Sequence, residues 1–583
     1  MEKGKIKFEF NAKTIKKRIL PVILVSVLTP LILFVAIPFE VYANNMDELL
    51  FSLSAFFPYC VLFGFLLAAG VACALLFLPE KIYRICYALI LALSFLFFMQ
   101  GTFLNFGANS LAGDNLGTNS VHIGLKILDL FIWIAVLGVA VALAIIKDKK
   151  GIFAIVAVIL AIVVVATQII TPMASTVKHP DVFLSKQEQL EKDDGDYKNE
   201  VLSCQNLTSV SSERNIFYFC IDKFDEYFAE VANDKAYKLY DNLDGFTWFQ
   251  DNISLYGHTF PAVAHMLTEN EYDIGQSRAP YLDNVYKENR TLNVLAENGY
   301  SINLYTVPYY AYNKANALPD NIENISEAKL FKTTHPMELV GYMIKLSVYR
   351  CLPHFLKDSI YGVKTNDFNL CVTSVGKNGY AGYLTDNATV YKQVSDAAFT
   401  TREGKNFSFI HIDGCHELSV DYFTKKVTAK QKNEITSAVS YSFSVVNEYI
   451  RVLKEKGLYE NATIIITGDH PVTVLSRTSL KGAKRTALFF KKSGDAGTPL
   501  VQSDAPVAHE NIWPTIMESE GIERENNGVT LYEVPENNER RHVWHTYFSN
   551  KCDEYVYKIT GSGKNFDNWE LIEQNYYDHC YWE

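Results

Sequence analysis

The sequence contains no pair of cysteines separated by two residues, although it has ten cysteines in 583 residues. Zinc ribbons and dithiol redox centres need such closely spaced thiols, so neither is predicted.

Positive charge is also scarce after the first part of the chain. Residues 1–150 contain 13 Lys and Arg against 9 Asp and Glu, a net charge of +4, whereas residues 151–583 have a net charge of −15. An acidic surface repels phosphate backbones, so no nucleic-acid partner is expected. An anionic substrate is not excluded, because a bound metal can reverse the local field.

Charged residues are missing from the interior of five long apolar segments. These segments are residues 19–39, 55–78, 85–106, 127–146 and 151–170. Each is near the length of about 20 residues that crosses a bilayer. A cleavable signal peptide would explain one such segment but not five. Asp129 lies near the end of one segment, whereas a transport path would place charge at depth. We therefore predict a five-helix transmembrane domain over residues 1–171 that serves as an anchor or lipid platform.

Lys and Arg in the connecting segments predict the orientation of these helices. The tail up to residue 18 contains seven, the connector at 79–84 contains two and the connector at 147–150 contains three. The intervening loops at 44–53 and 107–120 contain none. The positive-inside rule then places the N-terminus in the cytoplasm. With five spans, we expect a multi-pass cell-membrane protein whose remaining chain is extracellular.

Short apolar runs after residue 213 are typical of strands buried on both faces. They lie at 215–222, 300–307, 407–413, 462–469 and 486–492, and helix-like segments such as 428–456 separate them. This alternation predicts an α/β domain with a mostly parallel central sheet over residues 214–539. The polar, charged stretch 172–213 is predicted to be a linker. The tail 540–583, rich in aromatic residues, Gly and Asn, predicts a small β-rich subdomain.

Acidic and histidine side chains follow several of the predicted strands. Asp222 ends the first, Asp413 ends the third, and Asp469 with His470 follows the fourth. Sites in parallel sheets form beyond the carboxyl ends of the strands. Carboxylate oxygen and imidazole nitrogen suit Mn²⁺, Mg²⁺ or Zn²⁺. Asp222 could instead cap a helix, and His411, inside the third strand, is predicted to face the core.

Thr259 precedes Phe260 and Pro261 at the start of a predicted helix. Thr is a good N-cap and Pro favours the first helical turn, which would explain the pattern structurally. A hydroxyl at a helix N-terminus is also a suitable nucleophile, because the helix dipole stabilises its alkoxide and holds phosphate oxygens. A metal on the same oxygen would lower its pKa further. Thr259 is therefore the candidate nucleophile, and no role is assigned to the adjacent His258.

Five segments, in this order, resemble the sulfatase-like part of the alkaline phosphatase superfamily. They are NIFYFCID (215–222), GHTFPAVAHML (257–267), FIHIDGCHE (409–417), IIITGDH (464–470) and HENIWPTIM (509–517). With five spans ahead, the layout resembles the lipoteichoic acid synthase and phosphoglycerol transferase branch. The resemblance implies one divalent metal held by Asp222, Thr259, Asp469 and His470, and a phosphorylated Thr259 as intermediate. It places His416 at a substrate-contacting position, where it could donate a proton.

A two-metal variant of the superfamily implies a second set of ligands. Asp413, His416 and His509 would supply it, although the spacing from Asp413 to His416 is one residue shorter than usual. His509 could equally make an ordinary polar contact before the helix that follows it. Two further departures concern the substrate. Asp222 stands where lipoteichoic acid synthases have Glu, and the C/S-x-P-x-R signature of sulfatases is absent around Thr259.

The resemblance implies a membrane-anchored extracellular phosphoryl-group transferase. The expected cofactor is one divalent metal ion, Mn²⁺ first, with Mg²⁺ or Zn²⁺ as alternatives. The expected donor is a membrane phospholipid such as phosphatidylglycerol, and the expected acceptor is a cell-surface glycan or polymer such as teichoic acid. The alternatives are a phosphodiesterase or phosphatase that transfers to water, and a non-catalytic envelope-binding protein on the same fold.

Overall fold

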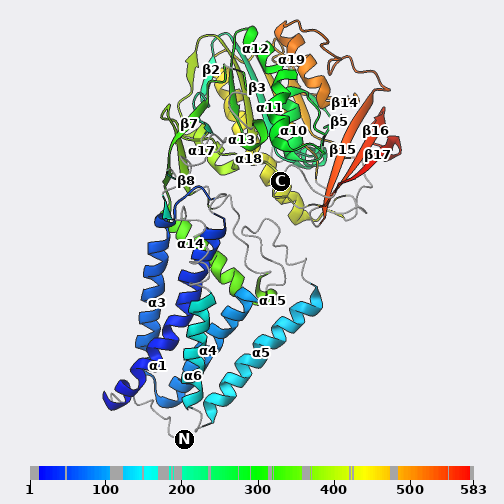
Figure 1. Cartoon of the computed structure of the whole chain (residues 1–583). Helices are drawn as coiled ribbons and strands as arrows, with labels where there is room; N and C mark the ends of the chain where they lie inside the picture. The colour runs from blue at the N-terminus through cyan, green and yellow to red at the C-terminus, as the bar shows by residue number, and fades with distance from the viewer. Residues whose placement is uncertain are drawn as a thin grey trace. The chain divides into compact units, whose positions relative to one another are not determined.

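The computed structural model of the chain divides into two compact units (Figure 1). The helical unit contains Met1–Asp193 and Leu330–Ser374, and the α/β unit contains Asp194–Lys329 and Val375–Glu583. The domain boundaries at residues 171, 213 and 539 remain predictions. The structure describes residues 12–45, 49–104, 122–146, 150–167, 183–184, 188, 200–233, 238–273, 275–288, 291–312, 318–319, 321–357, 368, 371–418, 420, 422, 426–472, 484–548 and 551–577.

Within its described residues, the helical unit contains four helices that are long and apolar enough to cross a membrane. The first, Thr14–Ala43, combines α1 (Ala12–Pro30), the π-helical segment η1 (Leu31–Ala36) and α2 (Ile37–Asn44). The others are α3 (Phe57–Phe77), α4 (Glu80–Thr102) and α5 (Ile123–Ile145). Large apolar side chains such as Phe65 and Phe131 are about two-thirds exposed on these helices, as contact with lipid requires. Four of the predicted spans are thus confirmed as long apolar helices.

The fifth predicted span, residues 151–170, coincides with α6 (Lys150–Val165). Its apolar part in the structure, Ile155–Val165, is shorter than a membrane-crossing helix. Residues 168–170 lie outside the described residues. A fifth span, and the extracellular position that depends on an odd number of spans, therefore remain predictions.

A segment from the middle of the chain also belongs to the helical unit. It contains α14 (Pro336–Cys351) and α15 (His354–Lys357). Asp129 on α5 is fully buried, and its Oδ2 accepts a 2.7 Å hydrogen bond from the backbone N–H of His354. Nε2 of His354 lies 2.8 Å from the carbonyl oxygen of Leu104. Asp129, which the sequence places near the end of a span, thus ties the inserted segment to α5.

The α/β unit is built on a seven-stranded sheet with the order β13-β4-β12-β11-β3-β10-β6. Its strands are β3 (Arg214–Ile221), β4 (Thr247–Phe249), β6 (Tyr300–Tyr305), β10 (Lys405–Ile412), β11 (Ala462–Gly468), β12 (Leu488–Lys491) and β13 (Val501–Ser503). β11, β3, β10 and β6 run parallel, and β12 pairs antiparallel with β11. The five predicted strands and the mostly parallel sheet are confirmed.

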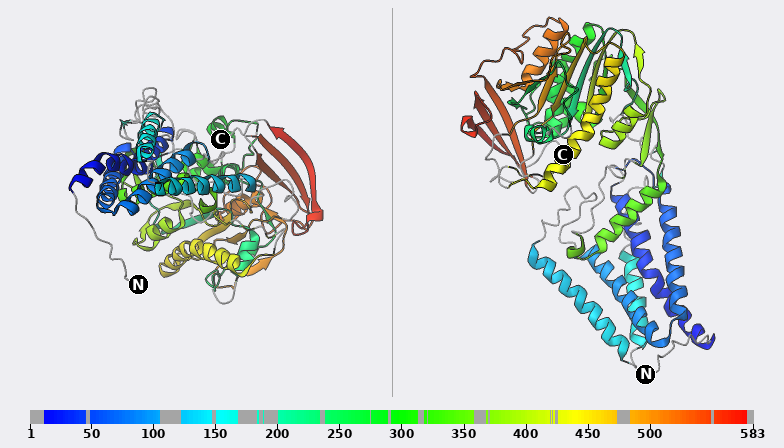
Figure 2. Two further views of the ribbon diagram at one scale, coloured as in Figure 1. Left: turned by 90° about the horizontal axis from the view of Figure 1, so that it is seen from below. Right: turned by 180° about the vertical axis from the view of Figure 1, so that it is seen from behind.

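Helices cover both faces of the central strand β3. Ile216, Tyr218 and Cys220 share an apolar core with α10 (Thr259–Thr268) and α19 (Ile512–Glu520). Phe217, Phe219 and Ile221 share the other core with α18 (Ala429–Glu455). The capping box of Thr428 and Gln431 starts α18, the long yellow helix in Figure 2. Burial on both faces explains why the sequence of β3 is continuously apolar.

Short pairings complete the α/β unit around the main sheet. β1 (Glu200–Leu202) pairs with β7 (Ile325–Thr333), β2 (Ser209–Ser211) with β9 (Thr400–Arg402), and β5 (Asn252–Ile253) with β14 (Val507–Ala508). β1 and β2 fall inside the stretch 172–213 that was predicted to be a linker.

The C-terminal residues form a separate antiparallel sheet of three strands (Figure 2). The strands are β15 (Glu539–Phe548), β16 (Lys551–Thr560) and β17 (Trp569–Tyr577). The predicted β-rich C-terminal part is thus confirmed. β15 contacts the segment before Thr259, because the N–H of Val543 donates to the carbonyl of Leu255 at 2.6 Å and Gly257 N–H donates to the carbonyl of Val543 at 3.2 Å.

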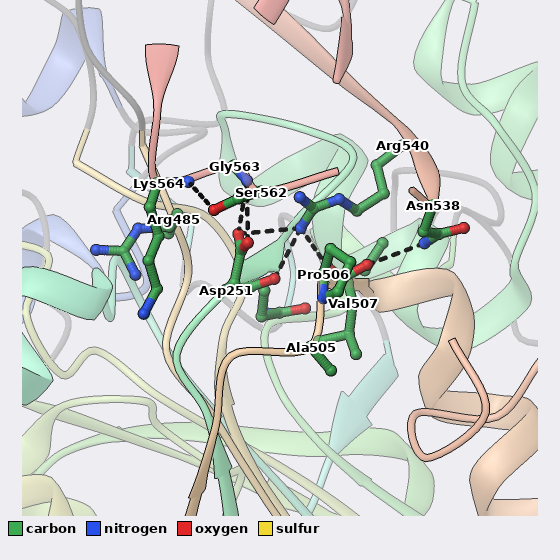
Figure 3. A network of polar contacts seen from close by, with 12 residues as sticks. Asp251, Arg485, Ala505, Pro506, Val507, Asn538, Arg540, Ser562, Gly563 and Lys564 are labelled. Atoms are coloured by element: carbon green, nitrogen blue, oxygen red, sulfur yellow. Dashed lines mark hydrogen bonds and ion pairs between the residues drawn. The ribbon is translucent and has the colours of Figure 1, made fainter. Parts of the chain in front are cut away.

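A buried ion pair joins β15 to the residues next to β5 (Figure 3). Nη1 of Arg540 lies 3.2 Å from Oδ1 of Asp251, and the two side chains are 1% and 0% exposed. The same Nη1 donates to the carbonyls of Asp251 and Val507, and the N–H of Gly563 donates to both carboxylate oxygens of Asp251. These bonds pair the two charges and occupy Nη1 where water does not reach them, whereas Nε of Arg540 has no hydrogen-bond partner among the described residues.

We expect Asp251→Asn to destabilise the α/β unit by about 3–5 kcal/mol, because it leaves the Arg540 guanidinium buried without a counter-ion. The adjacent Arg541 provides a matched control, since its pair with Glu271 is largely exposed. Arg541→Met should cost less than about 1 kcal/mol. The measurement is the unfolding of the purified full-length protein followed by tryptophan fluorescence. Equal losses in the two variants would contradict a structural role for the buried pair.

Candidate functional site

The candidate site lies at the carboxyl ends of three neighbouring strands. Asp222 follows β3, His411 lies near the end of β10, and Asp469 follows β11. In the sheet, Ile221 is level with Gly468 on one side and with Ile412 on the other. One ligand atom from each of Asp222, His411 and Asp469 lies within 4.8 Å of the others, and all three side chains are buried. The sheet register therefore brings these distant residues together.

Asp469 and His470 reach the site because Gly468 allows two backbones to approach closely. A Cβ at position 468 would lie 2.7 Å from the carbonyl oxygen of Phe224, too near for any other residue. Oδ1 of Asp469 accepts hydrogen bonds of 2.8 Å from the backbone N–H groups of Lys223 and His470. Its Oδ2 is fully buried and accepts no hydrogen bond from any described residue. One carboxylate oxygen is thus held in place, and the other is available to a ligand.

His470 is oriented by its own neighbour. Nδ1 lies 2.6 Å from the carbonyl oxygen of Pro471, so it carries the proton and leaves the Nε2 lone pair directed into the site. Nε2 is 3.7 Å from Oδ1 of Asp222 and 3.5 Å from Oδ2 of Asp469. A metal-binding histidine is commonly fixed by a hydrogen bond of this kind at its other nitrogen.

Thr259 is the first residue of α10 and lies between the two sides of the site. Its hydroxyl donates to Oδ2 of Asp222 at 3.3 Å and lies 3.4 Å from Nε2 of His470. The N-cap is His258 and not Thr259, so the Thr259 hydroxyl is not used to cap the helix. The backbone N–H groups of the first turn point out of the N-terminal end of the helix. There they can bind an oxyanion.

His411 is a site residue that the sequence reasoning assigned to the core. It is buried, as predicted, but it contacts the site. Nδ1 lies 3.0 Å from the Thr306 hydroxyl, and Nε2 lies 3.8 Å from Oδ2 of Asp222 without a hydrogen bond to any described residue. One feature of the sequence could have identified His411 as a site residue. Side chains alternate between the two faces of a strand, so His411 lies on the same face as Asp413, two residues later.

His416 and Asp413 lie in the turn after β10. Nδ1 of His416 is 3.2 Å from Oδ1 of Asp222, and its side chain is 56% exposed. His416 therefore reaches both the site and solvent. Asp413 donates its backbone N–H to Thr385, and its carboxylate is half-buried. Gly414 makes this turn possible, since its φ is +51° and a Cβ there would collide with Ile221.

His509 does not join Asp413 and His416 through any hydrogen bond or ion pair between described residues. Its Nε2 lies 3.3 Å from the hydroxyl of Thr467, inside the domain. Burial, with a smaller effect of His265, lowers the pKa of His509 to about 3. The predicted ligands of the single metal lie close together around Asp222 and Thr259. The second metal site, with Asp413, His416 and His509 as ligands, remains a prediction.

The two buried carboxylates of the site have pKa values shifted in opposite directions. Burial raises the pKa of Asp222, but His416, His411 and His470 outweigh it and hold that pKa well below its usual range. Burial, followed by the charge of Asp222, raises the pKa of Asp469. Burial would lower the pKa of His411, but the Asp222 carboxylate raises it above its usual value. Carboxylates this close repel each other, and a cation between them would stabilise both in the charged form.

These residues fit a divalent metal by their chemistry. Oxygen donors come from Asp222, Asp469 and Thr259, and nitrogen donors from His470 and His411, a mixture suited to Mn²⁺, Mg²⁺ or Zn²⁺. The open Oδ2 of Asp469 and Nε2 of His411 would otherwise be buried without hydrogen bonds. The sequence predicted four of these five residues, and His411 is the addition.

Supporting residues hold the loops that carry the ligands. Asp225 caps α9 (Glu226–Ala232) through the N–H of Tyr227 and also accepts a 3.0 Å hydrogen bond from the N–H of Val472. It thereby joins the loop after β3 to the loop after β11. Lys223, directly after Asp222, has a φ of +54°. For a residue with a side chain this conformation costs about 1–3 kcal/mol, a strain that is typical of functional sites.

Comparison with solved structures finds similar folds at low identity. A lipoteichoic acid synthase, LtaP, from Listeria monocytogenes is 11% identical, with a TM-score of 0.33 over 60% of this chain and 86% of that chain. A phosphonate monoester hydrolase from Silicibacter pomeroyi is 14% identical, with a TM-score of 0.35 over 63% and 89%. A protein of the alkaline phosphatase superfamily from Vibrio parahaemolyticus is 11% identical, with a TM-score of 0.33 over 64% and 84%. Identities this low leave the substrate of this chain open.

No curated protein sequence matches the chain significantly. Residues 240–522 match the model of the sulfatase family. This range contains Thr259, His411, Asp469 and His470, and Asp222 precedes it at the end of β3. The resemblance drawn from the motifs is confirmed: residues 240–522 are similar to the sulfatase family, and they follow the apolar N-terminal helices.

Proposed function

We propose that the protein is a membrane-anchored, metal-dependent phosphoryl-transfer enzyme with Thr259 as its nucleophile. The position of the Thr259 hydroxyl carries this proposal. It lies at a helix N-terminus, 3.3 Å from Asp222 and 3.4 Å from His470, beside a buried carboxylate oxygen without a hydrogen-bond partner among the described residues. A sulfate ester is disfavoured as substrate, because the C/S-x-P-x-R signature in which sulfatases modify a Cys or Ser is absent around Thr259.

Each residue of the candidate site has a separate role in the proposed reaction. Asp222, Asp469, His470 and His411 would hold a divalent metal together with Thr259. The metal would lower the pKa of the Thr259 hydroxyl and stabilise charge on the phosphoryl oxygens. The Thr259 oxygen attacks phosphorus in line, and the first N–H groups of α10 bind the equatorial oxygens. His416, half-exposed and 3.2 Å from Asp222, is placed to give a proton to the leaving alcohol. An acceptor hydroxyl then takes the phosphoryl group from Thr259.

The proposed donor is a membrane phospholipid with a phosphoglycerol headgroup. The four apolar helices support this choice, because they keep the α/β unit at a membrane. The proposed acceptor is an envelope glycan or polymer. The predicted orientation puts both substrates on the extracellular side.

The test is the turnover of phosphatidylglycerol by the purified full-length protein in vesicles supplied with Mn²⁺. Release of diacylglycerol with phosphoglycerol attached to an added glycolipid acceptor would support the transferase. Release of diacylglycerol with free glycerol phosphate would instead assign a phosphodiesterase that transfers to water. Vesicles of phosphatidylcholine are the control for headgroup choice. If the protein binds metal and cleaves neither lipid nor a nitrophenyl phosphodiester, the catalytic proposal is wrong and a binding role remains.

A further inference from the structure

The helical unit contains a cavity of about 470 Å³ far in sequence from the residues of the candidate site. Helices α1, α4, α5 and α6 enclose it. Its lining is formed by Thr14, Lys17, Arg18, Pro21, Glu80, Tyr83, Arg84, Tyr87, Leu143, Ala144, Ile146 and Phe153. The volume is within the range of small-molecule sites, about 300–1,000 Å³. Nothing in the phosphoryl-transfer proposal uses this cavity.

Part of the lining is positively charged. Among the described lining residues, Lys17, Arg18 and Arg84 outnumber the one carboxylate, that of Glu80. The Arg18 guanidinium already has partners within the protein. It donates to Glu80 and to the carbonyl of Leu78, and it stacks 4.0 Å above the ring of Tyr83. Arg84 donates only through Nε, to Glu80 at 3.0 Å, and its two Nη groups have no hydrogen-bond partner among the described residues. Lys17 makes no ion pair with any described residue. The described lining residues thus have a net positive charge, and they include donors available to an anion.

The hydroxyl of Tyr87 is an independent sign of a ligand. Tyr87 is 5% exposed and lines the cavity, and its hydroxyl makes no hydrogen bond within the described part of the chain. Burying a hydroxyl without a partner costs about 1–3 kcal/mol. An oxygen acceptor in the cavity would remove that cost.

Pro21, Leu143, Ala144, Ile146 and Phe153 form an apolar wall of the cavity. A ligand that satisfies both the charged and the apolar lining has an anionic head and a hydrocarbon tail. Basic pockets between transmembrane helices on the cytoplasmic side are typical sites for anionic lipid headgroups. The positive-inside pattern predicts that Lys17 and Arg84 lie on that side.

We infer that this cavity binds one anionic phospholipid, with its phosphate between Lys17, the Nη groups of Arg84 and the Tyr87 hydroxyl. Arg84 can form two parallel hydrogen bonds with a phosphate. The apolar wall holds the first part of the acyl chains. The bound lipid is a structural or regulatory component and not the substrate of Thr259.

The test is the binding of an acyl-labelled fluorescent phosphatidylglycerol to the delipidated full-length protein in neutral detergent. Lys17→Gln should weaken binding about fivefold, the loss expected for one basic residue beside an anionic headgroup. Tyr87→Phe removes only the hydroxyl and should weaken binding about tenfold, the value of a hydrogen bond to a charged group. Lys16, adjacent to Lys17 and exposed, does not line the cavity. Lys16→Gln is therefore the matched control and should bind as the wild type does.

Two further experiments distinguish lipid binding in the cavity from binding at the candidate active site and from binding of a soluble phosphate compound. All measurements are repeated in the Asp469→Asn background with a chelator, so that binding at the candidate active site does not contribute. Unchanged results in the Asp469→Asn background would support lipid binding in the cavity, even if the proposed enzymatic function is wrong. Inorganic phosphate should not displace the lipid at equal concentration, because it lacks the acyl chains. Displacement by phosphate would assign the cavity to a soluble phosphate compound, and equal binding by Lys17→Gln, Tyr87→Phe and Lys16→Gln would overturn the inference.

Discussion

Thr259→Val should lower the rate of phospholipid turnover by at least about a thousandfold, as expected for loss of a nucleophile. Valine has the shape of threonine, so the helix start and the packing around Asp222 should survive. Thr259→Ser keeps the hydroxyl and should retain measurable activity. The measurement is diacylglycerol release by the full-length protein, combined with detection of a glycerophosphate group on residue 259 in the wild type.

A control from the same helix tests whether the effect is specific. Thr268, at the other end of α10, is buried and donates its hydroxyl to the carbonyl of Ala264. Thr268→Val makes the same chemical change about two turns away, and it should leave turnover within a few-fold of wild type. Normal turnover by Thr259→Val would rule out this residue as the nucleophile, whatever the metal content.

Asp469→Asn should abolish metal binding and activity together. The amide keeps an oxygen that can accept from the N–H groups of Lys223 and His470, so the loop should keep its conformation. The substitution removes the negative charge that would balance a cation in the buried site. Loss of a ligand or of its supporting contacts lowers metal affinity by about 10–100-fold or more. Elemental analysis of the purified full-length protein should give about one equivalent of divalent metal in the wild type and much less in the variant.

Asp413→Asn separates the one-metal from the two-metal arrangement. In the one-metal site, Asp413 is not a ligand, and the variant should retain its equivalent of metal. Two equivalents in the wild type that fall to one in Asp413→Asn would establish the second site. A wild-type protein that holds no metal after purification without chelators would contradict the fit of Asp222, His411 and Asp469 to a cation.

The main sheet could be predicted because its strands are buried on both faces. Burial of both faces makes β3, β10 and β11 continuously apolar, and the polar residues that end them are easily recognised. The same feature concealed His411, since a histidine inside an apolar run is expected to face the core. Its role depends on the register between β10 and β3, which local sequence does not specify.

The inserted helix α14 could not be assigned to the helical unit from sequence. Its charged residues, among them Arg350, argue against a place among apolar helices. The structure accounts for Arg350 by an ion pair of 3.2 Å with Glu40 on α2, more than 300 positions earlier in the chain. Such a pair is invisible to a hydropathy reading, because each residue is judged without its partner.

The inserted segment has a consequence for proteolysis. The chain passes between the two units three times, near residues 193, 329 and 374. A single cut in the polar stretch 172–199 would leave the α/β unit joined covalently to the inserted segment 330–374, which packs within the helical unit. Separating the α/β unit from the helical unit by proteolysis would need at least three cuts, so the α/β unit should resist release by a protease that recognises one site.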